Sequence, residues 1–322
     1  MKYILSILLL GLLFSCDNTF EIIEEPKDIP IVYGILSATD TAHYIRVERA
    51  FVDAEISANE LAQRPDSLYY PNAIVSLIDS DGTEFQLDRI DAALDGFPRQ
   101  EGAFAQTPNI LYKIKNSDII LKEGEQYSLE IDRQIESLPI VMATTVIIDK
   151  SLIRSPQNVL NFDPERFTAF TWREGDEAVI FDLFLDFNYR ERVRNSGDPY
   201  APKSVRWKVA SDIEAVKIDV PGINFFSFLA GAIEIDDSVE RIFESIDLEL
   251  ISGGEEIKEY IRIGEANLGI TSSQDVPTYT NLSEGRGLFS SLYREVKENI
   301  SLTNTSLDSL KEGSITGALN FE

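Results

Sequence analysis

The chain has 322 residues, with 55 Asp and Glu against 29 Lys and Arg, and a formal net charge of −26 at pH 7. Such an acidic surface repels phosphate backbones and anionic head groups, which argues against nucleic-acid binding and against membrane attachment through basic residues. Hydrophobic residues form 43% of the sequence, enough for a folded core. One cysteine and one histidine exclude an intrachain disulfide and a zinc site built from these residue types.

The first sixteen residues have the form of an export signal. Lys2 precedes an apolar run, Ile4 to Phe14, which is shorter than the roughly 18 apolar residues that a membrane span needs. The run ends at the only cysteine, and Leu13-Phe14-Ser15-Cys16 resembles a bacterial lipobox. This resemblance implies that residues 1–15 are a lipoprotein signal peptide, and that Cys16 carries acyl chains such as palmitate.

Acylation of Cys16 would attach the mature protein to a membrane of the cell envelope. One acyl methylene contributes about 0.8 kcal/mol when buried, so two or three chains on one cysteine hold firmly where a single chain holds marginally. Residues 16–26 would then be the acylated cysteine and a tether. Removal of residues 1–15 leaves 28 basic and 55 acidic side chains, a formal net charge of −27.

Residues 27–149 have the pattern of a β-sandwich, with short strands separated by turns. Ile31–Leu36 and Tyr44–Arg49 are expected as the first two strands. Ile74–Ile78 and Thr83–Leu87 should form a hairpin, because the Asp81-Gly82 pair between them favours a type I′ turn. Further strands are expected at Ile110–Ile114, within Leu121–Ile131 and at Val141–Ile148. In the second of these, the glycine turn at Gly124 and the alternating Tyr127, Leu129 and Ile131 resemble bacterial immunoglobulin-like and transthyretin-like modules.

Residues 150–322 are expected to form a second β-rich domain with a few short helices, after a boundary rich in Ser, Pro and Asn at Ser155–Asn158. A long strand with Phe181, Leu183, Leu185, Phe187 and Tyr189 on one face should pair antiparallel with Ser204–Val209. Other strands are expected at Phe167–Trp172, Ile242–Ile251 and from Gly285 to Leu302. A buried helix is expected at Asn224–Ala232 and a helical turn at Leu307–Glu312. A further helix is expected at Glu256–Ala266, because Ser252 and Glu255 before it have the spacing of a capping box.

Several of these segments together resemble an uncharacterised family of outer-membrane lipoproteins of the Bacteroidota, a domain of unknown function. They are the lipobox, Ile31–Leu36, Tyr44–Val47, Asn72–Val75, Leu121–Gly124 with Tyr127, and Tyr279–Phe289. The resemblance covers nearly all of the mature chain. It implies attachment to the outer membrane, on its periplasmic or cell-surface face, and a role beside TonB-dependent transporters, near which such proteins are often encoded. It supplies no catalytic residues.

The residues themselves indicate no catalytic site. His43 has no Gly-x-Ser-x-Gly nucleophile elbow to serve. Asp79-Ser80-Asp81-Gly82 begins like a calcium loop, but Thr83 stands at the third ligand position and a hairpin turn explains the motif better. Asp182 and Asp186 lie about 13 Å apart along one strand at roughly 3.3 Å per residue, beyond the separation of a glycosidase pair. We expect no cofactor.

Two patches are candidate contact sites. Arg190, Arg192 and Arg194 form the densest basic run in an acidic chain and could meet an acidic partner loop, although a solvated strand end is the alternative. Phe225–Leu229 and Tyr69-Tyr70 are aromatic stretches that fit a core or, if exposed, a partner surface. Asp-Ser/Thr-apolar triplets resemble the O-glycosylation acceptors of the same phylum and mark Thr41, Ser67, Ser238 and Ser309.

The sequence therefore favours an outer-membrane-anchored lipoprotein that acts as a binding or assembly module, with a TonB-dependent β-barrel transporter as its partner. The alternative is an envelope hydrolase that acts on glycan or peptide through carboxylates. A pocket with two convergent carboxylates would favour the hydrolase, and a mixed patch without such a pair would favour the module.

Overall fold

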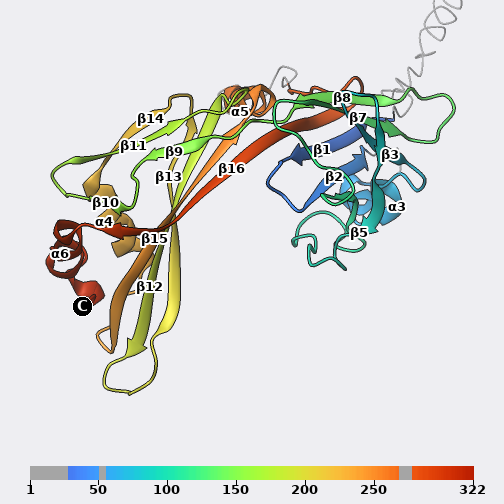
Figure 1. The fold of residues 1–322 in the computed structure, drawn as a ribbon. Coiled ribbons are helices and arrows are strands. Elements are labelled where there is room, and N and C mark those ends of the chain that lie inside the picture. The colour runs from blue at the N-terminus through green and yellow to red at the C-terminus, as the bar shows by residue number, and fades with distance from the viewer. Residues whose placement is uncertain (1–27, 51–55, 268–277) are drawn as a thin grey trace, which may run out of the picture.

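The computed structural model describes residues 28–50, 56–267 and 278–322, so the signal sequence, Cys16 and the tether lie outside the described residues. In this part the strands form one sheet of nine strands, one of three and one of four, with only short helices between them (Figure 1). The predicted mainly-β fold, a sandwich followed by a second β-rich region, is confirmed. No described helix is long and apolar enough to cross a membrane.

The N-terminal sandwich encloses one hydrophobic core between two sheets. One sheet segment contains β1 (Pro30–Leu36), β2 (Ala42–Arg49), β6 (Ile110–Lys115) and β5 (Asp88–Asp91). The facing sheet contains β4 (Glu84–Gln86), β3 (Ile74–Ile78), β7 (Gln126–Asp132) and β8 (Val141–Val146). Tyr127, Leu129 and Ile131 are buried, as their alternation predicted. The short helices α2 (Ala58–Ala62) and α3 (Pro65–Leu68) lie between β2 and β3 in the chain.

The hairpin of β3 and β4 forms where predicted, but the prediction of a type I′ turn is wrong. That turn needs positive φ at both central residues, whereas Gly82 (φ 82°) alone has a positive φ in this turn. The Asp79 carboxylate accounts for the difference, because it accepts backbone N–H groups of Asp81 at 3.0 Å and Thr83 at 2.8 Å. Those bonds, with the one from Thr83 dominant, also lower the pKa of Asp79.

The second region is built on long antiparallel strands. They are β12 (Ile180–Val193), β13 (Ala201–Ile213), β15 (Val239–Gly253) and β16 (Arg286–Leu302), in the order β13-β12-β15-β16. Their inner face packs on helix α4 (Gly222–Ala232) and on a small sheet of β14 (Lys217–Pro221), β11 (Phe167–Arg173) and β9 (Leu152–Ser155). β10 (Val159–Leu160) pairs with the end of β16, and α6 (Asn304–Glu312) and a 3₁₀ turn at Gly317–Leu319 complete the chain. Phe225, Phe226 and Leu229 are buried, so this aromatic stretch belongs to the core.

β16 joins the two regions into one sheet. Its residues 286–291 pair in parallel with β1, and residues 292–300 pair antiparallel with β15. Phe289 therefore packs in the N-terminal core and Tyr293 in the second core. The two cores divide between Ile147 and Ile148, close to the predicted boundary at residue 149, but β16 carries chain from the second predicted unit into the first sandwich.

Helix α5 (Glu255–Asn267) forms close to its predicted position, but the predicted capping box does not. Ser252 pairs with Phe181 near the end of β15, and its buried hydroxyl donates to Ser151 Oγ at 2.8 Å. Ser252 is therefore part of strand β15 and does not cap helix α5 as its spacing to Glu255 predicted.

Candidate binding surface on the long sheet

The outer face of the long strands is polar because β12 alternates. Its buried residues face the core, and Asp182, Asp186 and Asn188 point to the other side. β13 supplies Arg206 and Lys208 to this outer face, and β15 and β16 supply Glu249 and Arg294. We call Asp182, Asp186, Arg206, Lys208, Glu249 and Arg294 the charge ladder.

In the charge ladder, acids and bases alternate across four strands. Lys208 Nζ lies 3.1 Å from Asp182, and Arg206 bridges Asp186, at 2.9 Å, and Glu249. Arg294 Nε completes the row at 2.7 Å from Glu249. The guanidinium of Arg206 also lies over the Phe184 ring at 4.4 Å, which covers the one aromatic residue of β12 that points outward. The ladder is therefore nearly neutral in a strongly acidic chain.

Asp186 of the charge ladder has other carboxylates close to it. It lies opposite Asp247 in the β12–β15 register, and like charges in that position are unfavourable. Burial raises the pKa of Asp186; the Arg206 contact opposes the rise, and Glu249 and Asp247 add to it.

Irregular strand pairing opens a polar hollow beside the ladder, with a volume of about 490 Å³. The β12–β15 register shifts after Asn188, and the β15–β16 register shifts between Ile246 and Leu248. Asn299 on β16 has a left-handed backbone (φ 60°) at this point. Bulges redirect side chains out of a regular pleat. Among the residues that line the hollow are Asn188, Ser204, Ser245, Asp247, Glu298 and Asn299.

The polar groups of the hollow are held in place by one another. The Asn188 amide donates to Asp247 Oδ2 at 2.7 Å and to Ser245 Oγ at 3.2 Å. The backbone N–H of Asn299 donates to Asp247 Oδ1 at 2.8 Å. Both oxygens of Asp247 therefore already accept a hydrogen bond.

The carboxylates of the charge ladder are each paired with a base, so the ladder offers no free acid–base pair. Asp182 and Asp186 contact Lys208 and Arg206, and Glu244 at the rim of the hollow pairs with Arg190. Over residues 28–50, 56–267 and 278–322, no group of three His, Cys, Asp or Glu side chains is arranged to hold a metal ion.

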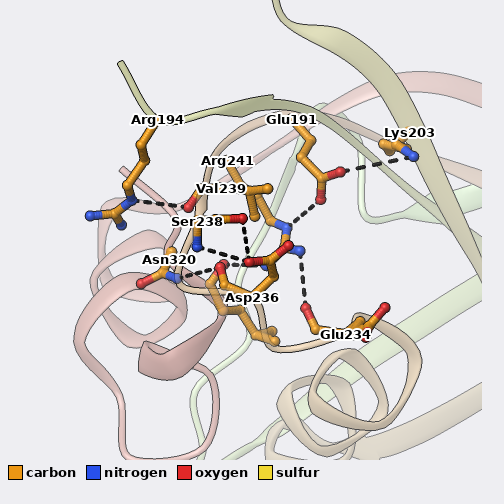
Figure 2. A network of polar contacts seen from close by, with 10 residues as sticks. Glu191, Arg194, Lys203, Glu234, Asp236, Ser238, Val239, Arg241 and Asn320 are labelled. Carbon is orange, nitrogen blue, oxygen red and sulfur yellow. Dashed lines mark hydrogen bonds and ion pairs between the residues drawn. The ribbon is translucent and has the colours of Figure 1, made fainter. Parts of the chain in front are cut away.

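The three arginines predicted as partner contacts lie at the end of the β12–β13 hairpin. Arg190 pairs with Glu244, Arg192 pairs with Glu240, and the Arg192 guanidinium lies 4.2 Å from the centre of the Tyr200 ring. Arg194 Nε donates to the Val239 carbonyl at 3.0 Å, while its terminal nitrogens point away from the neighbouring network (Figure 2). The positive patch is thus largely neutralised, because acidic residues about fifty positions later in the sequence pair with it.

A buried arginine that the sequence did not single out lies on the opposite face of this hairpin. Arg241 is 2% exposed, and its guanidinium donates to Glu191 at 2.8 Å and to the carbonyls of Leu319 at 2.7 Å and Glu234 at 3.0 Å (Figure 2). The network fastens the C-terminal residues to the hairpin. The sequence feature that could have indicated this network is an arginine at an inward-facing position of a predicted strand.

The remaining predicted residues are scattered. His43 is 2% exposed, and neither ring nitrogen has a hydrogen-bond partner in the described structure. Tyr69 and Tyr70 are buried, so this aromatic pair is part of the interior.

The four predicted glycosylation acceptors differ in accessibility. Thr41 is exposed before β2, while Ser67 is half-buried in α3. The hydroxyl of the exposed Ser238 donates to Asp236 at 2.6 Å, and that of the half-buried Ser309 donates to the Thr305 carbonyl at 2.9 Å. Thr41 is the easiest of the four to modify, and glycosylation remains a prediction.

Fold and surface together define a β-rich protein with two large hydrophobic cores, one shared sheet and a polar outer face. No family model and no curated protein matches the chain. One solved structure that it resembles is the C-terminal globular domain of an oligosaccharyltransferase from Pyrococcus abyssi, with 13% identity and a TM-score of 0.24. The match covers 69% of this chain and 45% of that one, so the chain spans less than half of that structure. A likeness at this level carries no argument about function.

Proposed function

We propose that the protein is an outer-membrane lipoprotein, anchored through Cys16, that acts as a binding or assembly module for a TonB-dependent β-barrel transporter. The observation that supports a binding role is the charge ladder with its adjoining hollow. Fixed, paired charges on an accessible sheet face favour specific contact and orientation of a partner. Glycoside hydrolysis, in contrast, needs one carboxyl poised as an acid and a second as base or nucleophile.

The position of the hairpin suits such a role. The tether would join the folded part at Asp28, whose carboxylate accepts hydrogen bonds from Tyr70 at 2.6 Å and from Arg133 at 2.8 Å. The outer ends of β12 and β13 lie at the opposite end of the molecule from β1 and β8 (Figure 1). An anchored molecule would therefore present the hairpin away from its attachment point.

The test is affinity purification of the full, acylated chain from detergent-solubilised outer membranes. We expect one integral β-barrel protein in near-equal amount. Cys16→Ser should abolish acylation and release the protein from the membrane fraction. Pelleting of this variant after a high-salt wash would contradict the anchor, and recovery of no barrel protein with the acylated chain would contradict the partner.

A single substitution among Arg190, Arg192 and Arg194 tests the electrostatic contact with the partner more specifically. Arg194 is the one of the three without a carboxylate partner among the described residues, so Arg194→Ser should slow association and reduce its salt dependence. The matched control is Arg154→Ser on β9, which removes the same charge from an exposed side chain away from the hairpin end. Equal effects of the two variants would show that the change follows net charge and that Arg194 makes no specific electrostatic contact.

One observation favours the hydrolase alternative. Burial raises the pKa of Asp186 above its ordinary value, which is the direction that a general acid requires, although the ion pair with Arg206 opposes the rise. Under this alternative the purified protein would hydrolyse an envelope glycan or peptide, and Asp186→Asn would abolish the activity. Hydrolysis that survives this change would exclude Asp186 as the acid.

A further inference from the structure

We propose that the polar hollow beside the charge ladder binds a glycan, through the hydroxyl groups of neutral or amino sugars. The inference rests on the proposed function as a binding module, and it names the class of ligand that this surface would capture.

The chemistry of the lining supports this ligand class. A sugar hydroxyl both donates and accepts a hydrogen bond, so its site must offer donors and acceptors side by side. The hydroxyls of Ser204 and Ser245 can do both, and Glu298 is an exposed acceptor. Both N–H groups of the Asn188 amide are used within the hollow, which leaves its carbonyl oxygen as an acceptor.

The same lining disfavours other ligands. Asp247 and Glu298 would repel a phosphate or carboxylate ligand, because their negative charges are not matched by a cation in the hollow. Lys203, the one basic residue of the lining, is already drawn toward Glu191 at 3.9 Å. An apolar molecule would leave the hydroxyls and the amide without partners.

One side of the hollow is organised before a ligand arrives. Asn188, Ser245, Asp247 and the Asn299 backbone are joined by hydrogen bonds on three adjacent strands. Groups that are already fixed lose little conformational freedom on binding, so weak polar contacts yield measurable affinity. The left-handed backbone at Asn299 is the local distortion that aims its N–H at Asp247.

The experiment measures binding of three probes, maltotriose, N,N′,N″-triacetylchitotriose and glucosamine trimer, to the purified chain by saturation-transfer NMR and calorimetry. We expect at least one of them to bind. Ser204→Trp should fill the hollow and abolish the signal, and Glu298→Gln should weaken binding about tenfold through loss of a charged acceptor. Ser211→Trp on the same strand and Glu312→Gln on α6 lie outside the hollow and serve as matched controls.

The outcomes separate this inference from the proposed function. Binding that is lost in Ser204→Trp and kept in Ser211→Trp supports the glycan site. Binding of none of the three probes overturns it, as does binding that both tryptophan variants retain. Because co-purification of a barrel protein is measured separately, recovery of that partner without sugar binding would refute the glycan site and leave the docking role standing.

Discussion

At the scale of single residues, Arg241 stabilises the outer end of the long β12–β13 hairpin from the neighbouring strand β15. Its guanidinium is almost fully buried and contacts one carboxylate and two carbonyls from three separate segments. Removal of one member of a buried charged network leaves the other members without partners, which costs more than the loss of an exposed pair.

We therefore expect Arg241→Met to lower the free energy of unfolding by about 3 kcal/mol. Arg190→Met, which removes an exposed pair with Glu244, should cost much less than that. Urea unfolding of both variants measures the difference. Equal losses would show that the buried network contributes no more than a surface ion pair.

His43 gives a prediction about pH. Burial lowers its pKa below 6.5, although Asp40 and Asn116 act in the opposite direction. The unfolded chain therefore binds a proton at higher pH than the folded chain, so stability should be full above the unfolded value and fall as pH drops from 6.5 toward the lower folded value.

The measurement is the thermal midpoint of the wild type and of His43→Phe at a series of pH values from about 8 to about 5. Because His43 is the only histidine in the chain, a difference between the two curves near pH 6.5 reports on this side chain. The variant should lose part of the decline below 6.5. Parallel curves would mean that His43 titrates alike in the folded and unfolded states.

At the scale of elements, the sequence predicted strands well where burial alternates and poorly where distant segments meet. The inward residues of β12 and β7 follow a period of two, so their strands and faces were evident. The parallel pairing of β16 with β1 joins residues about 250 positions apart, and no local pattern encodes it. Two local predictions were wrong for a related reason. At Asp79 a side-chain hydrogen bond to the Thr83 backbone sets a different turn, and at Ser252 strand pairing replaces the predicted helix cap.

Only a small part of the candidate site was predictable from the sequence, which singled out none of the residues that line the hollow as binding candidates. Asp182, Asp186 and the three arginines were recognised as charged positions of one strand. Their partners Arg206, Glu240 and Glu244 come from other strands, so pairing turned a predicted positive patch into a balanced surface. The hollow arises from register shifts, which composition and spacing do not show.

The β1–β16 junction depends on Gly287. This residue has φ 130°, and a Cβ atom there would lie 1.7 Å from the Val32 carbonyl oxygen. Gly287→Ala should therefore cost at least about 3 kcal/mol through strain and loss of strand pairing. Gly264→Ala in α5 is the control, because its added methyl meets open space and should stabilise the helix by roughly 0.5–1 kcal/mol. A mild effect at Gly287 would contradict the close approach of the two strands.

At the scale of the whole molecule, the shared strand predicts cooperative unfolding. β16 contributes to both cores, so loss of either core disrupts the pairing that completes the other. Calorimetry of residues 28–322 should show a single transition. Two separate transitions would mean that the regions fold independently despite the common strand.

Limited proteolysis should first cut the exposed Asn195–Pro199 loop within the described part.

The central claim is that the hairpin end of an anchored lipoprotein meets a β-barrel partner. The most direct measurement is photo-crosslinking in cells that produce the protein, with p-benzoylphenylalanine placed at Arg194, just after β12. The control position is the exposed Glu174, in the segment that leads into the opposite end of β12. We predict one dominant adduct with an integral outer-membrane barrel from position 194 and none from position 174. The absence of any barrel adduct from position 194, or the same adduct from both positions, would contradict the account.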